Sequence, residues 1–169
     1  WQWGQAGRRL LRTEWIKDEF PAGVLEQTES KQIGDPGYPS VKMGPLINEA
    51  QMEKVLRYME WGQEEGATML CGGCRLAGDA FDRGLYVQPT IFDNVDDGMK
   101  IAQDEIFGPV LSVLTFSDDD DALRIAKDTI PGLAASVGTK DLHLAVVNAN
   151  GPQGADVGVK AIHRRRHPV

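Results

Sequence analysis

Glu105 and Phe107 are the two side chains whose types and spacing most suggest chemistry. They belong to the stretch DEIFGPV, residues 104–110, which runs into the apolar segment LSVLTF. In an extended segment, side chains two positions apart leave the same face. A carboxylate and an aromatic ring would then project together, which suits a ligand with one diol and one flat ring. A surface acid beside a core phenylalanine explains the same pair, so the spacing alone leaves both interpretations open.

The two cysteines lie in a single CGGC stretch, Cys71 to Cys74. This spacing occurs in redox pairs and in halves of zinc sites, but a zinc site needs two more ligands and a reactive redox cysteine is favoured at a helix N-terminus. Neither condition is visible in the sequence. We therefore predict a strand end followed by a Gly-Gly turn, and no metal site.

The clearest predicted element is a helix that begins after Asn48. Asn48 can cap it, Gln51 can complete a capping box at the third helical position, and Gly66 can end it in the left-handed conformation. On spacing alone, Gln51 and Lys54 are solvated residues of an amphipathic helix. Its apolar stripe consists of Met52, Val55, Leu56 and Met59.

Helices and short strands alternate along the rest of the chain. A loose helical pattern covers residues 14–28, turns dominate residues 33–45, and Pro89 suggests an edge position for its strand. The acidic residues 118–121 suit the first turn of another helix, and a further helix is expected over residues 140–149. This alternation predicts an α/β fold with an open, mostly parallel sheet flanked by helices. The expected strands are ATMLCGG, YVQPTIF, VLSVLTF, LAASV and DVGVK.

Length and charge restrict the class of protein. A chain of 169 residues can form one domain with a substantial core. The net charge of −7 disfavours nucleic acid as a partner, and no apolar run is long enough for a membrane span. The first twenty residues lack the pattern of a secretory signal, so a cytoplasmic location is expected.

Five segments, taken in order, resemble a known family. GPLINEAQMEK, EEGATMLCGG, YVQPTIFDNV, MKIAQDEIFGPVLSVLTF and GLAASVGTKDL are similar to the C-terminal half of the catalytic domain of the NAD(P)-dependent aldehyde dehydrogenases. More loosely, they resemble the branch that acts on betaine aldehyde and aminoaldehydes. The resemblance implies a partial catalytic domain over residues 1–160, without a complete dinucleotide-binding domain. Residues 161–169 form a basic tail that we expect to be disordered.

The resemblance also assigns roles to four residues. It implies that Glu105 accepts hydrogen bonds from the hydroxyls of the nicotinamide ribose and that Phe107 packs against the nicotinamide. Gln51 and Lys54 would approach the ribose from the other side. The parent enzyme would use NAD or NADP to oxidise an aldehyde to a carboxylic acid, and it could associate as a homo-oligomer. Tight cofactor binding to this chain alone is not expected.

The family's nucleophilic cysteine has no counterpart here. Family members read Gly-Gln, then a few residues that include the cysteine, then Ala-Gly-Ser-Arg, whereas this chain reads GQAGRRLL. Alignment on Arg9 leaves about three residues missing between Gln5 and Ala6, the cysteine among them. The family's general-base glutamate would lie upstream of Trp1. Because the mechanism needs both groups, we expect the isolated chain to be inactive.

Two other functions are compatible with the sequence. One is a non-catalytic module that associates with itself or with a full-length subunit. The other is a small thiol protein that acts through the CGGC stretch. A cofactor titration and a count of free thiols would separate these functions from that of a dehydrogenase fragment.

Overall fold

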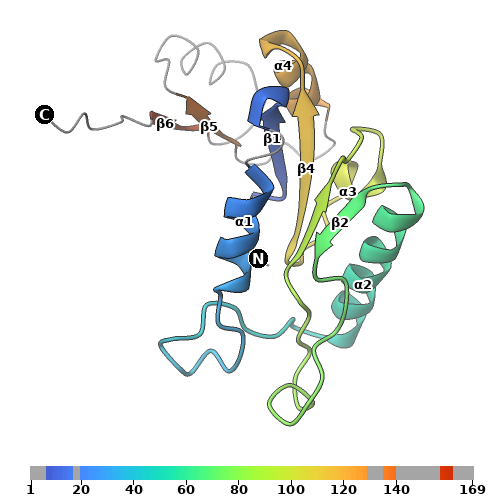
Figure 1. Ribbon diagram of the computed structural model, residues 1–169. Helices are drawn as coiled ribbons and strands as arrows, with labels where there is room; N and C mark the ends of the chain where they lie inside the picture. The colour runs from blue at the N-terminus through green and yellow to red at the C-terminus, as the bar shows by residue number, and fades with distance from the viewer. Residues whose placement is uncertain (1–6, 17–19, 129–134, 140–156, 162–169) are drawn as a thin grey trace, which may run out of the picture.

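The computed structural model describes residues 7–16, 20–128, 135–139 and 157–161 (Figure 1). Its elements, in chain order, are β1 (Arg9–Thr13), the 3-10 helix η1 (Glu14–Ile16), α1 (Phe20–Glu29), α2 (Glu49–Glu64), β2 (Thr68–Cys71), β3 (Thr90–Asp93), α3 (Lys100–Gln103), β4 (Val110–Phe116), α4 (Asp119–Lys127), β5 (Ala135–Thr139) and β6 (Val157–Ala161).

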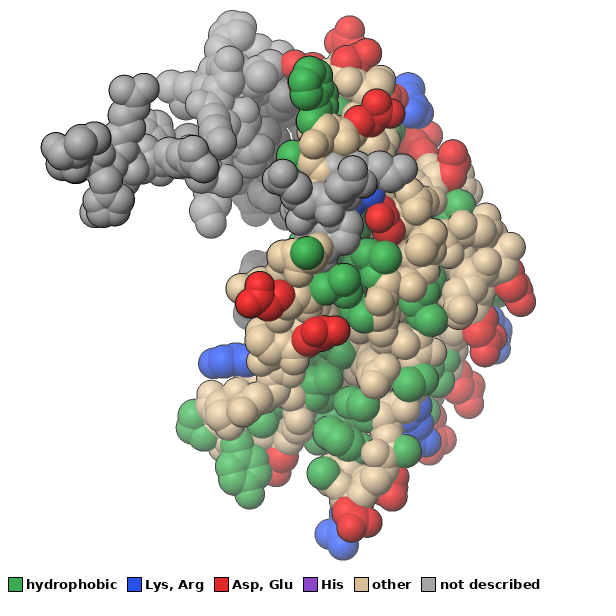
Figure 2. Space-filling view, viewed as in Figure 1, with side chains coloured by type: hydrophobic (Ala, Val, Ile, Leu, Met, Phe, Trp, Pro, Cys, Tyr) green, Lys and Arg blue, Asp and Glu red, His purple; other side chains and the backbone are tan. Residues whose placement is uncertain are grey.

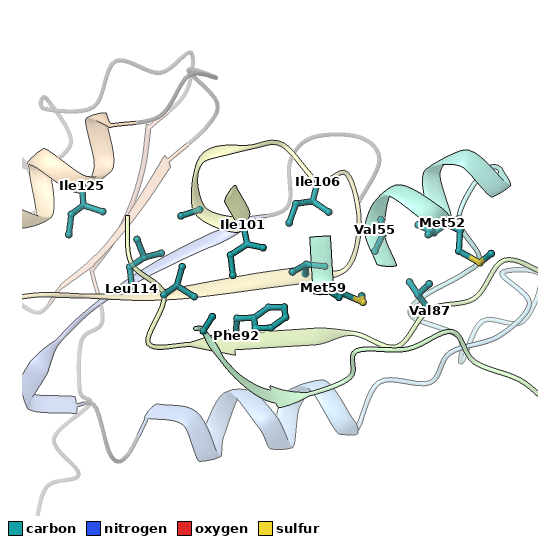
Figure 3. Close-up of a cluster of buried hydrophobic side chains, with 14 residues drawn as sticks. Met52, Val55, Met59, Val87, Phe92, Ile101, Ile106, Leu114 and Ile125 are labelled. Carbon is teal, nitrogen blue, oxygen red and sulfur yellow. The ribbon is translucent and has the colours of Figure 1, made fainter. Parts of the chain in front are cut away.

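Four of the strands form one open sheet in the order β1-β4-β3-β2. β1 and β3 both run parallel to β4, whereas β2 runs antiparallel to β3. β5 and β6 form a separate parallel pair. Figures 1 and 3 show α1 on the opposite side of the four-stranded sheet from α2 and α3. The predicted α/β class with an open, mostly parallel sheet flanked by helices is therefore confirmed.

The core lies between α2 and the sheet. One buried cluster contains Val55 and Met59 of α2, Phe92 of β3, Ile101 and Leu114 (Figure 3). All five side chains are at most 1% exposed. The period of the apolar stripe on α2 thus places one helical face against the sheet and leaves another face for polar contacts.

Helix α2 begins as the sequence predicts, but its capping box is only half formed. The Oδ1 atom of Asn48 accepts a hydrogen bond from the Gln51 backbone N–H at 2.8 Å, and Gly66 has a φ of +98° just after the helix. The Gln51 side chain does not return to the cap, because its Nε2 donates to the Ile106 carbonyl at 2.7 Å instead. The expectation of a complete capping box was wrong because a tertiary contact competes for the amide.

The strand that follows Pro89 is not at an edge, which corrects the sequence-based expectation. β3 lies between β4 and β2. Pro89 precedes the first residue of β3, so its missing N–H removes nothing from the ladder, which opens with the Thr90 N–H donating to Pro109 O at 2.8 Å. Sequence alone did not show where the strand would start.

The CGGC stretch forms the predicted strand end and turn. β2 ends at Cys71, and Gly72 and Gly73 have φ values of +86° and +89°. Cys71 and Cys74 are free thiols. A side chain at Gly72 would collide with the Pro89 carbonyl oxygen, so glycine is required there on two grounds.

The remaining expectations are met in part. The loose pattern over residues 14–28 becomes η1 and α1, and the acidic residues 118–121 begin α4, with Asp118 as its cap. The DVGVK strand corresponds to β6, and the LAASV strand corresponds to β5, shifted toward Thr139. The helix expected over residues 140–149 lies outside the described residues, as does most of the basic tail.

One face of the molecule shows how its charged and hydrophobic side chains are distributed. Figure 2 shows acidic side chains at several edges of this face, while hydrophobic side chains collect in the middle, in front of the sheet. No helix in the described ranges has the length and apolar character needed to cross a membrane.

Candidate functional site

Helix α2 and the segment from Asp104 to Phe107, which we call the 104–107 segment, bring all four predicted site residues together. The Nζ atom of Lys54 donates to the Glu105 carbonyl at 2.8 Å. The Nε2 atom of Gln51 donates to the carbonyls of Ile106 and Phe107 at 2.7 and 3.2 Å. Residues more than fifty positions apart in the chain are thus joined through main-chain oxygens.

Lys54 contacts the main chain of Glu105 and the side chains of two aromatic residues. Its Nζ lies 5.8 Å from the centroid of the Phe107 ring and 5.7 Å from that of Tyr58, both within the range of a cation–π attraction. The same ammonium contacts the Glu105 backbone. One ammonium therefore contacts the Glu105 carbonyl and the Phe107 ring, although not through the extended backbone that the alternation rule assumed.

Phe107 adopts a left-handed backbone conformation with a φ of +56°. This conformation corrects the expectation of an extended segment, and it is a strained one for a bulky residue. Two contacts compensate for the strain: Gln51 binds the carbonyls of Ile106 and Phe107, and Gly108 packs so closely on Val55 that a Cβ would collide with it. The Phe107 side chain is 37% exposed, so its ring remains accessible.

The Glu105 carboxylate is half-buried and available as an acceptor. Across residues 7–16 and 20–128, no side chain or backbone group donates a hydrogen bond to it. Arg8 is the nearby cation: burial lowers the pKa of its guanidinium, and the charges of Glu105 and Asp104 oppose that shift. The Arg8 Nη1 is buried, and no group in the described part of the chain forms a hydrogen bond with it.

Tyr58 is a site residue that the sequence reasoning missed. Its hydroxyl donates to Asp104 Oδ2 at 2.9 Å. Burial and the contact with Asp104 raise the pKa of Tyr58 to about 12, so the hydroxyl remains a donor at neutral pH. Extension of the Gln51–Lys54 spacing by four positions along α2 leads to Tyr58, and this was the available signal.

The described residues contain no group of three or more side chains suited to a metal ion. Gln5 and Ala6, which flank the predicted gap at the cysteine position, lie outside the described residues, and the structure continues from Gly7. The 104–107 segment carries one carboxylate and one exposed aromatic ring, and α2 adds the Lys54 ammonium. These groups suit a hydroxylated ligand that carries a flat ring.

The chain is similar to members of one known protein family. Residues 2–167 match the aldehyde dehydrogenase family. The chain is 47% identical over 136 residues to a betaine aldehyde dehydrogenase of Brucella anthropi, a stretch that covers 80% of this chain and 28% of that protein. A betaine aldehyde dehydrogenase of Brucella ovis is 46% identical over the same shares.

Solved structures of aldehyde dehydrogenases have a similar fold. A betaine aldehyde dehydrogenase from Staphylococcus aureus in complex with NAD+ superposes with a TM-score of 0.89 at 34% identity, covering 94% of this chain and 32% of that one. The aldehyde dehydrogenase KauB from Pseudomonas aeruginosa gives a TM-score of 0.86 at 45% identity, with 91% and 31% covered. The chain thus spans less than a third of the length of each of these proteins.

Proposed function

Because the chain belongs to the aldehyde dehydrogenase family, we propose that it supplies the nicotinamide-ribose side of an NAD(P)+ site in an enzyme that oxidises an aldehyde to a carboxylic acid. The observation that carries the proposal is the Glu105 carboxylate, half-buried on a fixed segment and without a hydrogen-bond donor in the described residues. Glu105 accepts hydrogen bonds from the two ribose hydroxyls, and the Phe107 ring packs against the nicotinamide. When bound, NAD(P)+ supplies the hydride acceptor.

In this proposal, Gln51 and Lys54 each hold the 104–107 segment and also contact the ligand. The Lys54 ammonium has three donors and uses one on the Glu105 carbonyl, so others remain for a ribose hydroxyl. The Gln51 amide nitrogen holds the carbonyls of Ile106 and Phe107, which leaves its Oε1 as an acceptor. Both residues position the 104–107 segment and keep one atom for the ligand.

The proposed activity belongs to the whole enzyme and not to this chain by itself. The two cysteines, Cys71 and Cys74, both lie outside the GQAGRR segment, where the family's nucleophile is expected. Without a thiolate at that point, no covalent adduct with the aldehyde can form there. We therefore propose that the isolated chain does not oxidise aldehydes, and that betaine aldehyde is the first substrate to test in a complete enzyme.

Grafting into the full-length Brucella anthropi relative tests these statements together. A graft of residues 44–116 keeps the relative's own cysteine segment and is expected to oxidise betaine aldehyde. A graft of residues 4–116 replaces that segment by GQAGRR and is expected to lose activity. In the active graft, Glu105→Gln should weaken NAD+ affinity about ten- to a hundredfold, because a hydrogen bond to a charged group is worth about 1.5–3 kcal/mol.

Glu53→Gln is the matched control, since Glu53 is an exposed residue of α2. It should leave both cofactor affinity and single-turnover rate unchanged. Equal effects of Glu53→Gln and Glu105→Gln would refute the assignment of Glu105. Full activity in the graft that carries GQAGRR would refute the statement about the nucleophile.

A further inference from the structure

Three polar side chains on one face of helix α2 contact the 104–107 segment at all four of its residues. Gln51, Lys54 and Tyr58 are spaced by three and four positions, so they share a helical face. Their contacts run in reverse chain order: Gln51 binds the carbonyls of residues 107 and 106, Lys54 binds that of residue 105, and Tyr58 binds the side chain of residue 104. Three side chains of one helical face therefore hold all four residues of the segment.

Tyr58 is itself firmly placed. Its ring packs edge-on against Trp61, with centroids 5.0 Å apart, and lies 5.7 Å from Lys54 Nζ. These contacts fix the direction of the hydroxyl, which donates to Asp104 Oδ2 at 2.9 Å. The bond is charge-assisted and partly buried, which places it among the stronger hydrogen bonds.

The segment needs this support because Phe107 is strained. Ile106 anchors it on the apolar side, at 3% exposure, close to Val55 in Figure 3. Carbonyls held by Gln51 and Lys54 fix the middle of the segment, and Asp104 is the first residue after α3. Release of Asp104 would free the end that Glu105 directly follows.

We infer that Tyr58 and Asp104 are positioning residues that hold the Glu105 carboxylate in place for a nucleotide ribose. The inference rests on the proposed function of Glu105 and extends it to two residues that do not touch the ligand. Tyr58 acts through Asp104, and Asp104 acts through the backbone that the two consecutive residues share.

Relaxation NMR on the whole 169-residue chain, with NAD+ titrated to millimolar concentration, tests this inference. Backbone order parameters at residues 105–107 should be near 0.85, about the value of rigid backbone, and should fall below about 0.6 in Tyr58→Phe. The phenylalanine keeps the contacts with Trp61 and Lys54 and removes only the hydroxyl. NAD+ affinity should weaken about tenfold, as the loss of one charge-assisted bond implies.

Matched variants separate positioning from general stability. Tyr38→Phe, at a tyrosine that is 66% exposed, should change neither quantity. Asp104→Ala should lower the order parameters and the NAD+ affinity as much as Tyr58→Phe does. Asp104→Asn should keep much of both, because its amide oxygen still accepts the hydrogen bond. The double variant Tyr58→Phe/Asp104→Ala should lose no more of either quantity than each single variant. If Tyr58→Phe fails to fold, the comparison of Asp104→Ala with Asp104→Asn provides the test.

The outcomes distinguish this inference from the function on which it rests. Unchanged order parameters, or a loss of order with unchanged NAD+ affinity, would overturn the positioning role. Absence of any NAD+-induced shift in the unmodified chain, or shifts that Glu105→Gln leaves intact, would overturn the proposed cofactor site and the inference with it. Equal losses of order and of NAD+ affinity in Tyr58→Phe and Asp104→Ala, with both quantities largely kept in Asp104→Asn, would support the positioning role and the proposed cofactor site.

Discussion

At the residue scale, the two cysteines have different surroundings although only two glycines separate them. Cys71 is half-buried, with its Sγ 3.7 Å from the Pro89 carbonyl oxygen, whereas Cys74 is exposed. Burial raises the pKa of the Cys71 thiol. Because the thiolate is the nucleophile, a raised pKa lowers the reactive fraction at neutral pH.

We predict that alkylation at neutral pH labels Cys74 before Cys71. Reduced access slows Cys71, and each unit by which its pKa is raised lowers its thiolate fraction about tenfold. Mass spectrometry of the alkylated peptides over time measures both rates, and Cys74→Ser isolates that of Cys71. Equal rates, or one tightly held zinc per chain in elemental analysis, would contradict the assignment of ordinary structural thiols.

At the element scale, helices α2 and α4 both start with a side-chain cap. Asn48 Oδ1 accepts from the Gln51 N–H at 2.8 Å, and Asp118 Oδ1 accepts from the Asp121 N–H at 2.9 Å. Each cap satisfies a backbone donor that the helix cannot pair by itself. The two caps differ in context, since α2 carries the candidate site and α4 does not.

We expect Asn48→Ala and Asp118→Ala each to lower the free energy of unfolding by about 1 kcal/mol, the usual cost of a lost cap. Chemical denaturation measures the change. Asn48→Ser keeps a capping oxygen and should recover most of the loss. A full loss in Asn48→Ser would show that Asn48 contributes through something other than its cap.

At the scale of the whole molecule, a buried ion pair crosses the sheet. Arg12 on β1 reaches over β4 to Asp93 on β3, with Nη2 2.6 Å from Oδ1 and side chains only 1% and 9% exposed. The two residues are 81 positions apart. The pair therefore joins β1 to the middle of the sheet.

Arg12→Met should destabilise the fold by about 3–5 kcal/mol, because it leaves a buried carboxylate without its cation. The unfolding midpoint in denaturant measures the loss. The double variant Arg12→Met/Asp93→Asn also removes the unpaired carboxylate charge and should recover a substantial part of the lost stability. Two losses that simply add would indicate that the residues do not act as a pair.

The sequence by itself determined the features that depend on near neighbours. The limits of α2 follow from Asn48 just before the helix, an apolar stripe along it and Gly66 just after it, and the glycines of the CGGC turn follow from backbone conformation. The α/β class likewise follows from alternating periodicities. Glu105 and Phe107 were selected by residue type and by family resemblance, because their motif is contiguous.

Only the tertiary structure decided what depends on partners distant in the chain. Pro89 precedes a central strand because strand order is set by long-range pairing, and Phe107 is left-handed because α2 binds the neighbouring carbonyls. Tyr58 and Asp104 meet across 46 positions. Local periodicity and capping involve residues a few positions apart, whereas strand pairing and packing of α2 on the sheet bring these residues together, so no local pattern in the sequence contains them.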